Sequence, residues 1–380
     1  MSEEKKPFCL STKPNEDSPL LNSDKFLEDF NLLNVELTTK EAFLSFLHDH
    51  KNDNIVAIYG GFPQFTSIGG LTKEIIEHED FPQCTLKCIV LCSRGYNMID
   101  IKTLKKFGIQ LYNYQDEVDE SIAIETFKVG QVGNDVADCA MWHVLEGFRK
   151  FSYQQSIIRK LGNTNETRAN IANKTGYVFG HEYLRGQSIR SPRGKKCLVL
   201  GLGSIGKHVA LKLQDGLGMD IHYCKRTEDL QVKEKYGWKF HPLDDSLYSQ
   251  LFQFKAIVVA LPGTAETKHL INEKFLAHCD GPELVLVNLG RGQILDIDAV
   301  TTAFEEGQLR HFGGDVFYEE PKVNSDVLKM EDTTSVTPHV ASATVEVFEQ
   351  ACELALTNII RSITEEDNES PDTECFSRVV

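Results

Sequence analysis

The sequence predicts an α/β protein built from two doubly wound parallel sheets. Its 380 residues exceed the size of one typical core, so two domains are expected. Short apolar runs of strand type alternate with helical patterns along most of the chain, as in parallel sheets. One of these runs leads directly into a glycine-rich turn at 201–206, which opens an amphipathic helix.

The first predicted domain covers residues 23–147, and the helical pattern at 344–366 completes it. Residues 1–22 are polar and contain prolines, so they predict a disordered arm, and the acidic residues 367–380 predict a disordered tail. Strands are expected at 56–59, 87–91 and 109–112, with helices at 71–79 and 101–107 between them.

The second predicted domain covers residues 148–343 and contains the glycine-rich turn. A helical pattern over 134–161 is too long for one packed face, so we expect it to bridge the two domains. Strands of the second domain are expected at 197–200, 221–223, 256–260 and 284–288, with shorter ones near Phe312 and at 335–337.

Composition narrows the range of partners. The net charge of -16 argues against nucleic acid or an anionic membrane surface. No run approaches the ~20 apolar residues of a membrane span, and the first residues lack the apolar core of a signal peptide, so a cytoplasmic protein is expected. The ten cysteines form no Cys-x-x-Cys pair and no histidine cluster accompanies them, which favours reduced thiols and no metal.

The glycine-rich turn is a candidate pyrophosphate site. Gly201 allows a tight turn, Gly203 allows close approach of the backbone to a phosphate, and Gly206 allows tight packing of the helix on the strand. Ser204 and Ile205 begin the helix, whose free N–H groups and positive dipole favour an anion. The turn therefore predicts dinucleotide binding.

The end of the next strand predicts which dinucleotide binds. Enzymes that bind NAD place an acid there for the ribose 2′-OH, whereas this chain has Lys225, Arg226 and Thr227. The two cations suit a 2′-phosphate, so we predict NADP, with NAD possible. The alternative is an ordinary basic turn.

Three later segments carry side chains suited to acid–base chemistry. Arg291 follows a strand between two glycines, Glu319 and Glu320 precede a proline, and His339 follows another strand. An arginine can hold a carboxylate in two places, a histidine can transfer a proton near neutral pH, and a carboxylate can orient its imidazole. Each residue taken singly could also be an ordinary surface residue.

At these motifs the chain resembles the D-isomer-specific 2-hydroxyacid dehydrogenases, and within them the glyoxylate/hydroxypyruvate reductase type. The resemblance runs from about Ile55 to Ile363 and is strongest in the second domain. Its motifs follow in the family's order as Gly201–Gly206, Leu261–Ile271, Arg291-Gly292, Asp315–Pro321 and Pro338-His339.

The resemblance implies roles for these positions. Arg291, Glu320 and His339 match the family's catalytic residues, and Asp315 matches the residue that holds the nicotinamide carboxamide. The dinucleotide would also be contacted by Leu261, Pro262 and Thr267. The family fold is a Rossmann cofactor domain inserted into a flavodoxin-like substrate domain, with the active site in the cleft between them. Reduction of a small 2-oxo acid by NADPH or NADH and a homodimer are expected on the same ground.

One segment departs from the family. The substrate loop usually reads Gly-x-Gly-Tyr-Asp, whereas this chain has Ser93-Arg94-Gly95-Tyr-Asn. Arg94 and Gly95 are the candidate substrate-binding residues, and Arg94 either faces solvent or adds a contact for a second acidic group of the substrate.

A function of another class remains open. The corepressors called C-terminal-binding proteins resemble the same family and keep the same three residues while acting as partner-binding modules. A non-catalytic, dinucleotide-binding regulator is therefore the alternative.

Overall fold

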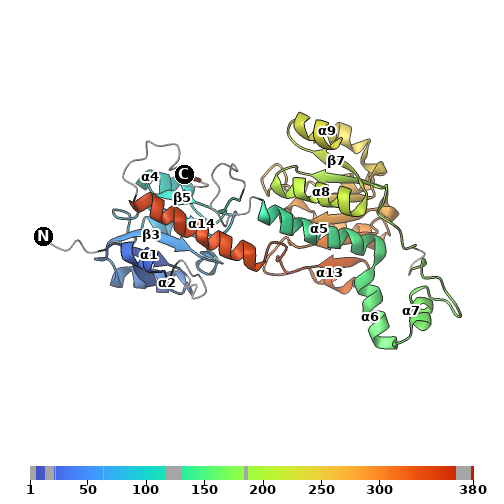
Figure 1. Cartoon of the computed structure of the whole chain (residues 1–380), viewed down its shortest axis with the longest axis horizontal. Coiled ribbons are helices and arrows are strands. Elements are labelled where there is room, and N and C mark those ends of the chain that lie inside the picture. Colours follow the sequence, from blue (N-terminus) through green and yellow to red (C-terminus); the bar gives the residue numbers. More distant parts are fainter. Residues whose placement is uncertain are drawn as a thin grey trace. The chain divides into compact units, whose positions relative to one another are not determined.

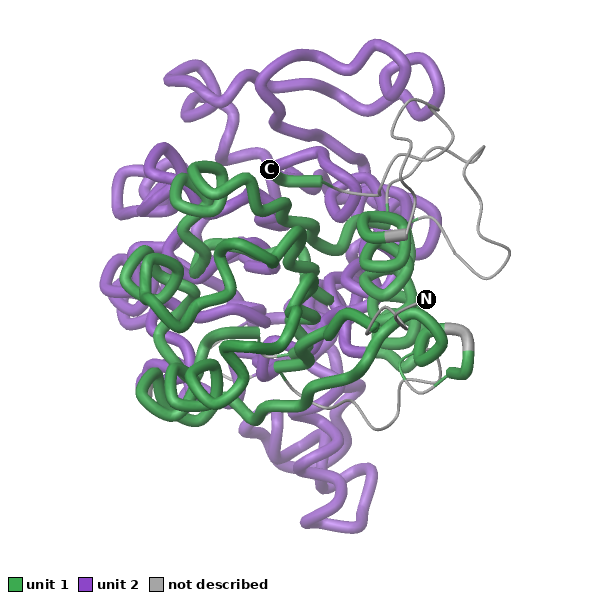
Figure 2. Tube along the Cα trace, turned by 90° about the vertical axis from the view of Figure 1, so that its left-hand side faces the viewer, with its two compact units in different colours: residues 1–131, 344–380 green, residues 132–343 purple. Residues whose placement is uncertain are grey.

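The chain forms two compact units (Figure 2). The computed structural model describes residues 6–12, 21, 23–62, 64–116, 130–183, 187–364 and 378–380. Unit 1 consists of residues 1–131 and 344–380, and unit 2 of residues 132–343. The sequence of unit 2 is thus inserted into that of unit 1.

Unit 1 contains a five-stranded parallel sheet with the order β2-β1-β3-β4-β5 (Figure 1). This order is that of flavodoxin-like folds, as predicted. The last helix, α14, contacts β3 and β4 and so joins the end of the chain to this sheet. The elements are β1 (Phe8–Ser11), α1 (Asp24–Asp29), β2 (Asn31–Asn34), α2 (Lys40–Asp49), β3 (Ile55–Gly60), α3 (Lys73–Ile76), β4 (Cys88–Leu91), α4 (Ile101–Phe107), β5 (Gln110–Tyr112) and α14 (Val345–Thr364).

The prediction of a disordered arm over 1–22 is wrong for part of that segment. Residues 8–11 form β1, which lies between β2 and β3, and Cys9 and Leu10 are fully buried. Four residues followed by a polar, proline-containing stretch carry too weak a strand signal, and pairing on both sides decides their conformation. Residues 1–5, 13–20 and 22 lie outside the described part of the chain.

The prediction of a disordered tail over 367–380 is wrong at its end. The Val379 N–H donates to the Leu111 carbonyl at 2.7 Å, and the Leu111 N–H donates to the Val380 carbonyl at 3.1 Å. Val379 and Val380 also pack against the core of unit 1. The last residues therefore pair with β5, and residues 365–377 lie outside the described part.

Unit 2 contains a seven-stranded parallel sheet with the order β12-β11-β10-β9-β6-β7-β8. Counted from β6, its first strand, this is the Rossmann order extended by one strand. Buried parallel strands read as continuous apolar runs, and the four residues of β9 have no exposed surface. The strands are β6 (Lys196–Leu200), β7 (Asp220–Cys224), β8 (Lys239–His241), β9 (Ala256–Val259), β10 (Val285–Asn288), β11 (His311–Gly314) and β12 (Thr334–Val336).

The helices of unit 2 other than α6 and α7 connect these strands or lie beside the sheet (Figure 1). The helices of this unit are α5 (Gln131–Arg149), α6 (Phe151–Leu161), α7 (Thr164–Ile171), α8 (Ser204–Leu217), α9 (Leu230–Tyr236), α10 (Asp245–Tyr248), α11 (Glu273–Ala277), α12 (Ile297–Glu305) and α13 (Ser325–Lys329). No helix of the described residues is long and apolar enough to cross a membrane.

The helical pattern predicted over 134–161 is two helices. The chain breaks at Lys150, which has φ 55° and a buried ammonium group 2.8 Å from His311 Nδ1. Beyond this residue α6 and α7 project from unit 2 (Figure 1).

The unit boundary also differs from the predicted 147/148. Unit 2 begins at Val132, because α5 packs on its sheet so closely that a Cβ at Gly147 would lie 2.5 Å from Val285 Cγ1.

Candidate active site

The residues predicted for the second domain gather at one edge of the sheet of unit 2. Each follows the carboxyl end of a parallel strand, where loops from neighbouring strands meet. Gly201 follows β6, Lys225 follows β7, Leu261 follows β9, Arg291 follows β10, Asp315 follows β11 and His339 follows β12.

The turn after β6 has the geometry of a phosphate cradle. Gly201 has φ 99°, and a Cβ at Gly206 would lie 1.9 Å from the Gly201 carbonyl oxygen. Gly203, the N-cap of α8, has no neighbour within 4 Å of a Cβ position and makes no side-chain cap hydrogen bond. Gly201 and Gly206 are required for the fold of the turn. The open space at Gly203 instead suits a pyrophosphate at the helix N-terminus.

We expect Gly203→Ala to weaken NADPH binding at least tenfold while the Tm changes little, because only a ligand would meet the new methyl group. Gly206→Ala is the matched variant, and its methyl group should lower the Tm by displacing the turn itself. Calorimetric titration and thermal unfolding of both variants check this. Equal loss of Tm in the two variants would contradict the assignment.

The helix α5 lies beside this cradle. A Cβ at Gly133 would lie 2.7 Å from Ser204 Oγ, and Ser204 and Ile205 are both half-buried. Further along the helix, Cys139 Sγ lies 3.8 Å from Thr337 Oγ1, and burial raises the pKa of this thiol to about 11. Cys139 is therefore a protonated thiol at neutral pH and not a nucleophile.

The turn after β7 contains the residues predicted to meet the ribose. Lys225 is half-buried, and Arg226 and Thr227 are exposed. No acid stands at the tip of the strand, as predicted, yet Lys225 Nζ donates to Asp229 Oδ2 at 3.2 Å. The sequence analysis missed Asp229, which reaches this turn as the N-cap of α9. The rule for NAD-binding enzymes places the acid at the end of the strand and does not cover that position.

The loop after β9 is braced by Thr267. Its hydroxyl donates to the Pro262 carbonyl at 2.7 Å and accepts from the Thr264 N–H at 2.8 Å. Leu261 packs against the core of unit 2 and lies near the cradle, since its Cδ2 would be 3.1 Å from a Cβ at Gly201. Thr267 thus shapes a loop that borders the cradle, and its contact with the dinucleotide stays a prediction.

Arg291 stands on a tightly packed turn. The buried side chain of Asn288 accepts from the Gly290 N–H at 3.2 Å and donates to the Arg291 carbonyl at 3.1 Å. A Cβ at Gly292 would lie 1.9 Å from the Phe317 carbonyl oxygen. The turn that bears Arg291 is therefore in contact with the loop that bears Glu320.

Glu320 and His339 meet directly. His339 Nδ1 lies 2.8 Å from Glu320 Oε2, while Glu320 Oε1 accepts from the Phe317 N–H at 2.8 Å. Both side chains remain open to solvent, with 51% of the His339 side chain exposed. The carboxylate is thus held by its own loop and orients the imidazole through Nδ1, which leaves Nε2 available for a proton transfer.

Asp315 holds the loop that bears His339. Its buried carboxylate accepts from Thr337 Oγ1 at 2.6 Å and from the N–H groups of Val340 and Ala341 at 2.9 and 3.0 Å. His339 itself has φ 57°, a left-handed conformation that is unfavourable for a residue other than glycine. These hydrogen bonds stabilise that conformation.

The predicted substrate loop belongs to unit 1. Arg94 Nη2 forms an ion pair with Asp116, whose carboxylate is fully buried, and 29% of the Arg94 side chain is exposed, so a contact with substrate stays a prediction. Asn113 Nδ2 donates to the Arg94 carbonyl at 2.8 Å, and Gln64 Nε2 donates to the Gly95 carbonyl at 2.9 Å. The loop is therefore held in place by side chains that sequence motifs did not reveal.

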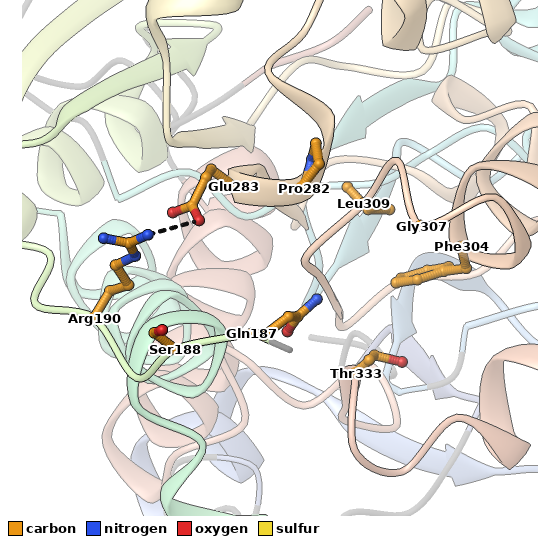
Figure 3. A pocket seen from close by; sticks show the side chains of 9 residues that line it. All are labelled: Gln187, Ser188, Arg190, Pro282, Glu283, Phe304, Gly307, Leu309 and Thr333. Carbon is orange, nitrogen blue, oxygen red and sulfur yellow. Dashed lines mark hydrogen bonds and ion pairs between the residues drawn. The ribbon is translucent and has the colours of Figure 1, made fainter. Parts of the chain in front are cut away.

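A separate cavity of about 230 Å³ lies at the opposite edge of the sheet of unit 2 (Figure 3). Glu283, Leu309 and Thr333 line it and precede β10, β11 and β12, and Glu283 forms an ion pair with Arg190 at 3.2 Å. This cavity is distinct from the predicted site. No group of His, Cys, Asp or Glu in the described ranges could hold a metal ion.

Similarity to known proteins identifies the family. A model described as "D-isomer specific 2-hydroxyacid dehydrogenase, NAD binding domain" matches residues 157–341. A Saccharomyces cerevisiae protein named "Putative 2-hydroxyacid dehydrogenase" is 58% identical over 367 residues, which cover 97% of this chain and 95% of that protein. This chain belongs to the D-isomer-specific 2-hydroxyacid dehydrogenase family.

Other members of the family are more distant. The glyoxylate reductase of Pyrococcus horikoshii is 30% identical over 291 residues, covering 76% of this chain and 77% of that enzyme. The D-mandelate dehydrogenase of Rhodotorula graminis has a similar structure, with a TM-score of 0.76, 25% identity and 94% of each chain covered. The predicted fold and family are confirmed, and the chain is an oxidoreductase of this family.

Proposed function

We propose that this 2-hydroxyacid dehydrogenase reduces a small 2-oxo acid of the glyoxylate or hydroxypyruvate class to the D-2-hydroxy acid. The single observation that carries the proposal is the 2.8 Å hydrogen bond between His339 and Glu320, beside the turn that bears Arg291. A histidine oriented by a carboxylate can deliver a proton to the oxygen of a bound carbonyl. The similarity to glyoxylate reductases supports the substrate class.

The carboxyl edge of the sheet fits a nicotinamide dinucleotide. The open space at Gly203 suits the pyrophosphate. The turn after β7, with Lys225, Arg226 and Thr227, is where the adenosine ribose would lie. We propose NADPH as the preferred cofactor, with NADH also accepted. When bound, this cofactor supplies the hydride for the C2 carbonyl.

Arg291, His339 and Glu320 would have three different roles in the reaction. Arg291 would bind the substrate carboxylate and polarise the carbonyl, because a guanidinium offers two parallel donors. His339, as imidazolium, would give a proton from Nε2 to the carbonyl oxygen. Glu320 would accept from Nδ1–H and so orient the ring.

A turnover assay tests the proposal. The purified chain is mixed with NADPH or NADH and with glyoxylate or hydroxypyruvate. Oxidation of the cofactor is followed by the loss of its absorbance at about 340 nm. Turnover of either acid is expected, and the product from hydroxypyruvate should be the D-hydroxy acid, whereas the product from glyoxylate has no stereocentre. Binding of the cofactor without turnover of any 2-oxo acid would favour the non-catalytic regulator.

Glu320→Gln should lower kcat for reduction by about 10²-fold, because a neutral amide orients the imidazole less firmly than the carboxylate does. Steady-state kinetics with saturating NADPH and 2-oxo acid measure kcat. Glu319→Gln is the matched control and should leave kcat unchanged, and the reverse result would assign the orienting role to Glu319.

We also propose that the enzyme is a cytoplasmic homodimer. The helix α6 has no buried residue, and the side chains of Tyr177 and Phe179 beyond α7 are each 75% exposed. Large exposed apolar groups on a projecting segment suit contact with a second copy. Sedimentation velocity of the parent chain and of a Tyr177→Ser/Phe179→Ser variant tests the dimer, and cell fractionation tests the location.

A further inference from the structure

A carboxylate lies among the cations at the expected ribose site. Asp229 Oδ2 is 3.2 Å from Lys225 Nζ and 3.8 Å from Lys207 Nζ. Lys225 follows β7, Lys207 lies in the first turn of α8, and Asp229 precedes α9. Three segments therefore bring their charges together at this point.

The position of Asp229 is fixed from both sides. Its Oδ1 accepts from the Val232 N–H at 3.2 Å as the N-cap of α9, and its own N–H donates to the Tyr223 hydroxyl at 3.0 Å. The hydrogen bond from Val232 and then that from Lys225 hold the pKa of Asp229 below its usual value. The carboxylate is thus ionised at neutral pH, with Oδ1 used by the helix and Oδ2 directed at the cations.

We propose that Asp229 sets the choice between NADH and NADPH in this enzyme, an inference that rests on the proposed function. Its Oδ2 would accept the ribose 2′-OH of NADH, and the same atom would compete with the 2′-phosphate of NADPH for Lys225 and Lys207. A site with both a carboxylate acceptor and two lysines serves either cofactor, so the preference for NADPH is moderate.

Arg226 adds to this balance. It is exposed, and its charge contributes, after hydrogen bonds from Thr264 and from the Glu266 backbone, to the lowered pKa of Glu266. Each of the cations that would meet a 2′-phosphate is therefore near a carboxylate of the protein itself. The phosphate gains less from these cations than an unopposed basic turn would give it.

The test is the affinity ratio Kd(NADH)/Kd(NADPH), measured by calorimetric titration of the full chain. Asp229→Asn should raise this ratio about tenfold, because it removes the acceptor for the 2′-OH and a negative charge beside the phosphate. Asparagine is also a good N-cap, so α9 should keep its start. Glu228→Gln is the matched control, since Glu228 pairs with Lys233 at 2.9 Å, and it should leave the ratio unchanged.

A second variant keeps the test decisive if Asp229→Asn folds poorly. Lys225→Gln should lower the ratio by weakening NADPH binding while the Kd for NADH changes little. A ratio that is the same in the parent and both variants, or that moves equally in Glu228→Gln, overturns the role of Asp229. A parent chain that binds neither cofactor overturns the proposed function as well.

Discussion

His339→Ala is expected to lower kcat for 2-oxo acid reduction by about 10²–10⁴-fold while the Kd for NADPH stays near that of the parent. The imidazole is the proposed proton donor, and it takes no part in the hydrogen bonds that shape its loop, which Asp315 accepts from the Thr337 hydroxyl and two backbone N–H groups. Stopped-flow reduction of glyoxylate and calorimetric titration with NADPH measure the two quantities.

The control for this variant is His278→Ala. His278 is exposed on unit 2, and its Nδ1 lies 2.8 Å from the Lys274 carbonyl oxygen, away from the carboxyl edge of the sheet. Its kcat should equal that of the parent. A His339→Ala variant with full kcat, or one whose lost activity is matched by lost NADPH affinity, would refute the role in proton transfer.

Arg94→Met should lower the free energy of unfolding by about 2 kcal/mol, because it leaves the buried carboxylate of Asp116 without this cation. Methionine keeps the apolar length of the side chain, so the effect reports mainly on charge. Urea unfolding of Arg94→Met and of the double variant Arg94→Met/Asp116→Asn measures it, and the double variant should recover part of the loss.

This prediction also decides the role of the substrate loop. Lys51→Met, an exposed change on the same unit, should alter stability by less than about 0.5 kcal/mol. If Arg94→Met is as stable as the parent but loses activity only on a 2-oxo dicarboxylate, Arg94 binds substrate and the ion pair with Asp116 is unimportant.

Features that depend on local order along the chain could be predicted from the sequence alone. The spacing of the glycines at 201–206 predicted a tight turn between a strand and a helix, and the structure shows that turn. Apolar runs in the sequence predicted parallel strands, and Arg291, Asp315 and His339 each follow the end of such a run. The carboxyl ends of parallel strands share one edge of the sheet, which brings these residues to the same edge. The fold class followed from the same periodicity.

Features that depend on residues far apart in the chain became visible only in the folded molecule. The strand β1 is four residues long and is stabilised by strands on both sides, and the residues after 377 are ordered by pairing with β5. Asp229 reaches the ribose turn because α9 starts there, and Arg94 is turned toward Asp116 by its charge. Burial and ion pairing between distant segments leave no periodic signal in a single sequence, which is why these contacts required the fold.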